Sequence, residues 1–383
     1  MAKMSAAVSV FRTMAIALAL AHPSLAQSQP VVDGSTGQWT HRSTVQVVGR
    51  NFGSKATAAP VVWDDASGTT FSDKWDGAWP DRGSYPTGYR TPHRGVNLPH
   101  SNITRYIAGG HGDDSGYNAG YNVMFWKVRS ISSYPSYSYI SWYERADDNW
   151  VFGGDNNYKT FNYSTGDSPY NPANWYINFC CGLPNSRSAI TQYSMNDVSG
   201  TSWMNPDMNG HNNYWGDARN PHAGAWTKVE MEISYTNQTS GYIKLWENGV
   251  LKMDYRGPTD RWSGTQRTEG IGGYARMSGQ PSNWRYFADV YFDYSRARIV
   301  LGNASTLAQS TIREVQPPTA WSGTAATVTV NLGKFTPGQT AYVFVVDANG
   351  ISSQAGLRIT VGGGATTTTT PSQPKNLRVT PGS

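Results

Sequence analysis

Residues 222–255 read HAGAWTKVEMEISYTNQTSGYIKLWENGVLKMDY, and this stretch decides the fold class. Charged and apolar residues alternate over 226–233, which is the period of a β-strand whose successive side chains point to opposite faces. Within 242–255, Asn248 and Gly249 supply the two positive-φ positions of a tight hairpin turn. Short alternating runs bounded by Gly, Asn, Asp and Pro recur along the chain with almost no helical period. The sequence therefore predicts an all-β protein.

Two runs in the centre of the chain resemble a known scaffold. Residues 222–255 and 283–299 (NWRYFADVYFDYSRARI) are similar to strands of the concanavalin-A-like jelly rolls found in secreted polysaccharide lyases, laminarinase-type hydrolases and carbohydrate-binding modules. The resemblance implies a jelly-roll carbohydrate-active domain over 63–297, with one solvated convex sheet and one concave sheet that holds a glycan. Such strands occur in enzymes and lectins alike, so the function must be argued from the site.

Both ends of the chain carry immunoglobulin-like patterns. Residues 43–54 (STVQVVGRNFGS) resemble the opening of a TIG/IPT domain, an alternating run followed by G-x-N-F-G, and 296–362 resemble its later strands. We expect one discontinuous immunoglobulin-like domain, 30–62 plus 298–362, with the jelly roll inserted at an exposed loop. The alternative is a lone N-terminal hairpin with a separate C-terminal sandwich. The predicted fold class is thus a jelly-roll sandwich inserted in or beside an immunoglobulin-like β-sandwich.

The N-terminus predicts export. Lys3 and Arg12 are followed by an apolar run, and Ser24-Leu25-Ala26 after it has the small-x-small pattern of a cleavage site. Residues 1–26 are therefore predicted to be a secretory signal peptide. We expect a secreted protein, extracellular or periplasmic, and no membrane span, because no later stretch approaches the ~20 apolar residues that a span needs. Residues 363–383 resemble a Gly/Thr linker followed by a truncated fibronectin type III start.

The aromatic composition points to a sugar partner. The chain has 15 Trp and 23 Tyr against 11 Phe. Tyr and Trp add a polar tip to a flat face, which suits stacking against sugar rings; the alternative is a β-rich core that uses them as filler. The formal charge is +5, of which Lys3 and Arg12 supply two, and this mild excess favours an acidic partner. No block of Lys or Arg appears, which argues against nucleic acid.

One strand is the predicted binding strand. Over 136–145 a polar-aromatic face alternates with an apolar face that carries Ile140 and Trp142. We expect the polar face on the concave sheet, with tyrosine rings as stacking planes and Arg145 as a bidentate clamp for a uronate carboxylate. The alternative is that the tyrosines pack under a loop. The polar face consists of Tyr137, Tyr139, Ser141, Tyr143 and Arg145.

Two loops are predicted to complete the cleft, although a loop histidine is more often merely solvated than functional. Residues 109–121 (GGHGDDSGYNAGY) are Gly-rich, and 205–222 contain His, Tyr and Trp. Lys159, within NNYKTFNY, is a further candidate to contact a negatively charged sugar. The candidate residues of these loops are His111, Tyr117, Tyr121, His211 and Trp215.

If the protein is an enzyme, β-elimination on an acidic polysaccharide fits these residues best. That reaction needs a cation to neutralise the carboxylate, a base and an acid, and the resemblance implies that Tyr and His serve the last two roles. A tyrosine base would need Arg145 or Lys159 nearby to lower its pKa from about 10. The lyases' diagnostic catalytic strand motifs are not recognisable. The candidate catalytic residues are Tyr143, Arg145, His111 and His211, and the candidate substrate-binding residues are Tyr137, Tyr139, Lys159, Tyr117, Tyr121 and Trp215.

Hydrolase and metal chemistry are less well supported. Glu230 and Glu232 lie two apart on one strand, but the third acid of the E-x-D-x-x-E run of hydrolases with this fold is missing, so we interpret the pair as a solvated charged face. No zinc or calcium-loop motif is present, and no cofactor is expected. A structural Ca²⁺ would be held by Asp64 or Asp65 with Asp289; solvated turn aspartates are the alternative.

A function of another class also fits the modular pattern. A non-catalytic adhesin or surface-structure protein would use its immunoglobulin-like modules for protein or surface partners, and its aromatics would be core residues. Exposure of the tyrosine row in a groove would argue against that hypothesis. Burial of the same row would remove the predicted binding strand.

Overall fold

The computed structural model describes residues 28–78, 85–111, 121–130, 137–148, 158–168, 171–180, 192–197, 212–216, 222–259, 266–275, 283–364 and 366–367. These residues form strands β1 to β24 and one short 3-10 helix, η1 (Phe71–Asp73). The ladders between the strands are antiparallel. The prediction of an all-β protein is confirmed. In the part of the chain that is described, no helix has the length and apolar character needed to cross a membrane.

The central part of the chain forms two facing sheets, which we call the large sandwich. Its eight-stranded sheet runs, in spatial order, β15 (Val250–Arg256), β14 (Tyr242–Glu247), β13 (Thr227–Ser234), β8 (Ser138–Ala146), β17 (Asn283–Asp293), β6 (Tyr106–His111) and β5 (Tyr85–Arg90), with β3 (Val62–Asp64) paired to β17. Its seven-stranded sheet runs β12 (Asn212–Gly216), β11 (Gln192–Asp197), β10 (Asn171–Cys180), β9 (Tyr158–Ser168), β16 (Gln266–Ala275), β7 (Tyr121–Ser130) and β4 (Gly77–Ala78). Two antiparallel sheets face to face are an arrangement of the jelly-roll kind.

Alternation along the strands builds the core between these two sheets. On β13, Val229, Met231 and Ile233 are fully buried in the core, as their spacing predicts. Phe161 of β9 and Phe287 of β17 belong to the same cluster, so the core is shared by both sheets. The hairpin between β14 and β15 turns at the Asn-Gly pair, whose φ values of 47° and 76° are the positive pair that such a turn requires.

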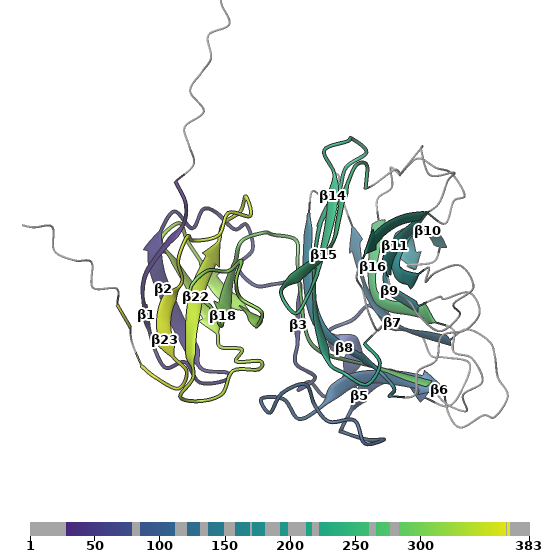
Figure 1. Ribbon diagram of the computed structural model, residues 1–383, viewed down its shortest axis with the longest axis horizontal. Helices are drawn as coiled ribbons and strands as arrows, with labels where there is room; N and C mark the ends of the chain where they lie inside the picture. Colours follow the sequence, from purple (N-terminus) through teal and green to yellow (C-terminus); the bar gives the residue numbers. More distant parts are fainter. Residues whose placement is uncertain are drawn as a thin grey trace, which may run out of the picture.

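The two ends of the chain meet in a second, small sandwich. Its five-stranded sheet runs β20 (Pro318–Trp321), β21 (Ala325–Thr329), β2 (Thr44–Arg50), β1 (Val31–Thr36) and β24 (Thr366–Thr367). Its four-stranded sheet runs β19 (Arg313–Gln316), β18 (Arg298–Gly302), β22 (Thr340–Val346) and β23 (Leu357–Thr360). Val45 and Val47 of β2 pair with Val328 and Ala326 of β21, so N-terminal and C-terminal strands lie side by side (Figure 1).

The small sandwich packs against the outer face of the eight-stranded sheet. In Figure 1 that sheet lies between the small sandwich and the seven-stranded sheet. Ion pairs cross the interface, including Arg298 of β18 to Glu232 of β13 at 2.9 Å and Lys228 of β13 to Glu314 of β19 at 3.3 Å. The face of the large sandwich that points away from the small one is therefore the outer face of the seven-stranded sheet.

Candidate functional site

The predicted tyrosine row lies inside the interface between the sandwiches. Tyr137, Tyr139 and Tyr143 are at most 4% exposed. The Tyr139 hydroxyl donates to Glu230 at 2.8 Å, and the Tyr143 hydroxyl donates to Glu314. The predicted position of this row on an open concave sheet is therefore corrected, because this face of β8 is where the small sandwich packs. No sugar ring can stack on these tyrosines while the two sandwiches are joined.

The surroundings of Tyr143 also oppose a catalytic role. Burial and the adjacent carboxylate of Glu314 raise its pKa well above the ordinary value of a phenol. A tyrosine base needs the opposite shift, toward neutrality. Tyr143 is therefore a hydrogen-bond donor within the interface.

The glutamates of β13 belong to the same interface. Glu232 pairs with Arg298, and Glu230 lies 3.6 Å from Arg313 while it accepts the Tyr139 hydrogen bond. Glu230 is only 4% exposed. The interpretation of this pair as a solvated charged face is therefore wrong. Both carboxylates tie the large sandwich to the small one.

The structure describes the side chain of Arg145 but only part of the loop candidates. Arg145 ends the row on β8, and its side chain, 12% exposed, forms an ion pair with Asp148. His111 is the last residue of β6, and its side chain lies outside the described part of the structure. Tyr117 and His211 lie wholly outside the described residues.

Tyr121 and Trp215 lie on strands β7 and β12 of the seven-stranded sheet, where their backbone is described. The strand register places both in the cross-strand row of Tyr158. The hydroxyl of Tyr158 donates to Glu144 in the interior at 2.8 Å. The side chains of Tyr121 and Trp215 lie outside the described part of the structure.

Lys159 lies on the outer face of the seven-stranded sheet. Its neighbour Tyr158 and, further along β9, Phe161 both belong to the core. Both can point inward because the register between β9 and β10 shifts between them. Phe161 pairs with Ile177 and Lys159 with Asn178, so Thr160 is the extra residue of a β-bulge. Lys159, next to an inward side chain, therefore faces outward.

A polar and aromatic row crosses the same face. Asn162 lies between two core residues of β9 and so faces outward, and in β16 its register partner is Gly270. Gly270 pairs in turn with Trp126 of β7, which follows the core residue Phe125, and Trp126 pairs with Gly77 of β4. The backbone register extends the row in the other direction through Tyr176, Asn196 and Asn212.

The glycine in this row separates two functional groups. Gly270 has no side chain, so the cross-strand row carries none between Asn162 and Trp126. A glycine in a strand interior often marks a place where a ligand approaches the backbone closely.

A glycine bulge next to this row is held from both faces. Gly272 and Gly273 have φ values of 84° and 141°, which residues with a Cβ rarely adopt. The register between β9 and β16 shifts at these glycines. The Asn162 amide donates to the Gly272 carbonyl at 2.7 Å on the outer face. Arg285 donates to the Gly273 carbonyl at 3.1 Å from the interior.

Lys159 brings a positive charge to this face, and its polar neighbours there include Asn162 and Thr268. Lys159 is 7% exposed and Asn162 is fully buried. Other parts of the protein therefore cover Asn162 and leave a small part of Lys159 accessible, and a carboxylate that reaches Lys159 is attracted more strongly than in bulk water. We call Lys159, Asn162, Gly270 and Trp126 the outer-face site.

The aspartates considered for calcium are occupied by protein donors. Asp64 accepts hydrogen bonds from Trp75 at 2.7 Å and from Tyr89, and Asp65 pairs with Arg42 at 2.5 Å. The third aspartate, at position 289, accepts from Asn331 at 2.8 Å. In the described part of the chain, no three His, Cys, Asp or Glu side chains are grouped so that they could hold a metal ion.

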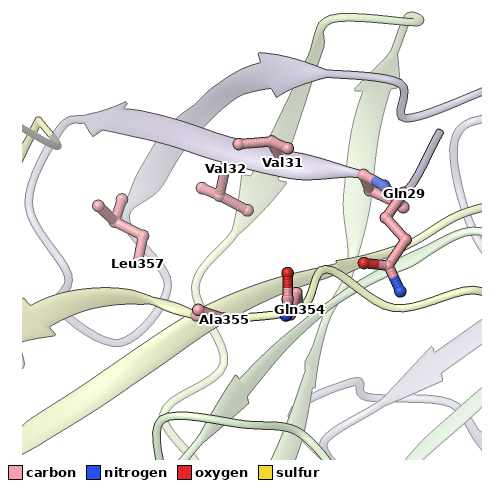
Figure 2. A pocket seen from close by; sticks show the side chains of 8 residues that line it. Gln29, Val31, Val32, Gln354, Ala355 and Leu357 are labelled. Atoms are coloured by element: carbon pink, nitrogen blue, oxygen red, sulfur yellow. The ribbon is translucent and has the colours of Figure 1, made fainter. Parts of the chain in front are cut away.

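Two grooves lie elsewhere on the structure. Figure 2 shows one of about 300 Å³ on the small sandwich, between residues 29–32 and 354–357; its walls are aliphatic with two glutamines, and its lining residues carry no charge. The other, of about 290 Å³, lies along residues 54–61 and 293–295, where Lys55 forms an ion pair with Asp293. The first groove has no charged lining residue, and the lysine of the second is paired with Asp293.

Comparisons with known proteins gave structural matches only. No protein-family model matches the chain, and no curated protein matches it. The chain is similar to the solved structure of endo-beta-1,4-glucuronan lyase from the fungus Trichoderma reesei, with 14% identity and a TM-score of 0.41 over 57% of this chain and 90% of that one. It is also similar to the cellulose induced protein Cip1 (16% identity, TM-score 0.35, 61% and 97% of the two chains). A third match is the alginate lyase Aly36B (9% identity, TM-score 0.36, 69% and 98%). At these values the likeness assigns no activity.

Proposed function

We propose that this protein binds an acidic polysaccharide on the outer face of its seven-stranded sheet. The observation that carries the proposal is the outer-face site, in which Lys159, a side-chain amide and an indole lie on one face beside a side-chain-free strip at Gly270. Lys159 would pair with a sugar carboxylate and the partly exposed Trp126 would contact the ring, while the buried Asn162 would hold the bulge at Gly272 beneath them. The face is also the one that the small sandwich leaves uncovered.

The proposal includes the setting in which binding takes place. Residues 1–26 have the pattern of a secretory signal peptide, so we propose a secreted protein. The two-sheet packing of the small sandwich, built from both chain ends, supports an immunoglobulin-like module that carries the large sandwich. N-terminal sequencing of the exported protein tests the first point: a start after Ala26 is expected, and retention of residues 1–26 would contradict it.

Affinity gel electrophoresis tests the binding itself. The protein is run in gels that contain alginate, glucuronan or pectate, and in gels that contain a neutral glucan as the control. We expect retardation by at least one acidic polymer, and Lys159→Met to weaken that binding about tenfold or more, the effect of removing an enclosed charged hydrogen bond. Lys244→Met, a lysine on β14 of the other sheet, is the matched control and should bind as the wild type does.

The outcomes separate the classes of function. Equal migration in every gel would overturn the polysaccharide proposal and favour an adhesin. The release of unsaturated product is measured by its ultraviolet absorbance. Binding without such release would define a binding module. Release of that product would extend the proposal to β-elimination, in which Lys159 supplies neutralisation of the carboxylate.

A further inference from the structure

An ion pair is buried between the two sheets, beneath the outer-face site. Glu144 of β8 and Arg285 of β17 are 0% and 1% exposed, and the Arg285 guanidinium donates to the Glu144 carboxylate. Removal of two charges from water is costly, and well-packed apolar residues often replace such a pair without loss of stability. Stability of the fold alone is therefore a weak reason for this pair.

Glu144 also accepts from Trp142 of its own strand and contacts His222, and two further hydrogen bonds of the pair reach across to the seven-stranded sheet. Glu144 accepts from the Tyr158 hydroxyl of β9 at 2.8 Å, and Arg285 donates to the Gly273 carbonyl of β16 at 3.1 Å. The guanidinium also lies 4.1 Å from the centre of the Tyr158 ring. One buried pair thus holds two neighbouring strands of the opposite sheet.

These two strands are held at the point where their register changes. Phe161 pairs with Ile271, but Tyr158 pairs with Ala275, so β16 has an extra residue over this interval, at the bulge of Gly272 and Gly273. A shift of strand register moves side chains from one face to the other, and a strand without a fixed register can slip. The contacts of the pair therefore hold β9 and β16 together where the regular register between these two strands is interrupted.

One contact adjoins a residue of the outer-face site, and the other adjoins a residue to which the site is hydrogen-bonded. Tyr158 directly precedes Lys159, and Gly273 directly follows Gly272, whose carbonyl accepts the Asn162 amide. Movement of Tyr158 would redirect Lys159, and rotation of the Gly273 peptide would disturb the Asn162 hydrogen bond.

We propose that Glu144 and Arg285 are positioning residues of the glycan site, which hold Lys159 and Asn162 in place from beneath the sheet through Tyr158 and Gly273. This inference rests on the proposed function, since it names what sets the geometry of the same site. Neither residue of the pair contacts the ligand.

Two substitutions break the links while they keep the bulk of the core. Tyr158→Phe removes the hydrogen bond to Glu144. Arg285→Lys keeps the charge but lacks the planar fork that can bond Glu144 and Gly273 together. The matched control is Tyr291→Phe, which also removes a buried phenol-carboxylate hydrogen bond, to Asp293, in the cluster with Tyr137 and Tyr139 on the other face of the eight-stranded sheet.

Two measurements decide the inference at a temperature where all variants are folded. We expect faster amide hydrogen exchange over 158–163 and 270–275, and about tenfold weaker binding of the acidic polymer that retards the wild type, in Tyr158→Phe and Arg285→Lys. Tyr291→Phe should lose a similar amount of stability and leave both measurements within about twofold. Stability is followed in parallel by urea unfolding.

The contrary results are distinct. If the two variants lose stability as the control does but bind and exchange like the wild type, the pair is only structural and the inference fails. If the wild type binds no acidic polymer, the proposed function fails. The exchange measurement still decides in that case whether the pair holds the bulge, and unchanged exchange at 270–275 would overturn the inference by itself.

Discussion

Tyr143 of β8 donates its hydroxyl hydrogen bond to Glu314 of β19, so a phenol of the large sandwich satisfies a buried carboxylate of the small one. A second buried phenol-carboxylate hydrogen bond, from Tyr139 to Glu230, lies within the large sandwich. Burial of a carboxylate is costly unless donors reach its oxygens, and a tyrosine adds a donor to a ring that otherwise packs as phenylalanine does. This explains much of the excess of Tyr over Phe without any sugar partner. Further pairs are Tyr158 with Glu144, Tyr235 with Glu269, Tyr286 with Asp147 and Tyr291 with Asp293.

Replacement of Tyr143 by Phe should destabilise the protein and leave glycan binding unchanged. The carboxylate of Glu314 would lose one buried donor, which lowers the free energy of unfolding by about 1–3 kcal/mol. Urea unfolding measures the first effect and affinity electrophoresis the second. Loss of binding with unchanged stability would restore the tyrosine row as a binding surface.

Lys228→Met should have a larger effect, because it removes the cation from a buried ion pair. Lys228 lies 3.3 Å from Glu314, and both side chains are nearly inaccessible. An uncompensated buried charge costs about 3–5 kcal/mol. The double variant Lys228→Met/Glu314→Gln should recover part of the loss in a double-mutant cycle followed by urea unfolding. Additive losses in the cycle would show that the two groups do not interact.

Gly77→Ala should weaken binding of the acidic polysaccharide through Trp126. A Cβ at Gly77 would collide with the Trp126 indole, so the ring would have to leave its place in the outer-face site. The strand β4 is short and lies at the edge of its sheet, so we expect a loss of stability of about 1 kcal/mol or less. Gly323→Ala is the control, since a Cβ there meets nothing within 4 Å. Unchanged affinity with a displaced indole, seen by tryptophan fluorescence, would remove Trp126 from the site.

The stability contributed by His222 should disappear as the pH rises from about 6.5 to about 9. Burial lowers the pKa of His222, but hydrogen bonds to Glu144 and Glu247 outweigh that effect and raise it to about 9. A histidine whose pKa is raised on folding stabilises the protein fully below its unfolded pKa and loses that contribution as the pH passes the folded value. The stability difference between wild type and His222→Gln should therefore shrink by about 3 kcal/mol across this window. Burial lowers the pKa of His93, so the stability difference between wild type and His93→Gln should not change with pH across this window. A stability difference for His222→Gln that is also independent of pH would contradict the prediction.

Local sequence patterns predicted the strands but not their neighbours. The Asn248-Gly249 turn and the inward Val229, Met231 and Ile233 follow from the order of residues alone. The alternation on β8 is also as predicted, yet alternation cannot tell which face is open. The residue that covers Tyr143 is Glu314, 171 positions away in the sequence, and no local period carries that information.

The outer-face site was predicted only in part, for a related reason. Lys159 was named from its position in NNYKTFNY. The bulge at Thr160 breaks the period of two, so the outward position of Asn162 did not stand out. Gly270 and Trp126 join Asn162 only through the register of three strands, which the sequence of any one of them does not specify.

The pairing of β2 with β21 has a consequence for synthesis on the ribosome. Val48 lies opposite Ala325, so β1 and β2 emerge long before their partner strand exists, and the whole large sandwich is translated in between. During that interval Val45 and Val47, fully buried in the finished molecule, have no β21 to cover them and depend on chaperones or on their own hairpin. Closure of the large sandwich brings residues on either side of it together, which shortens the loop that the last strands must close. Translation order thus allows the large sandwich to fold before β2 and β21 pair and complete the small sandwich.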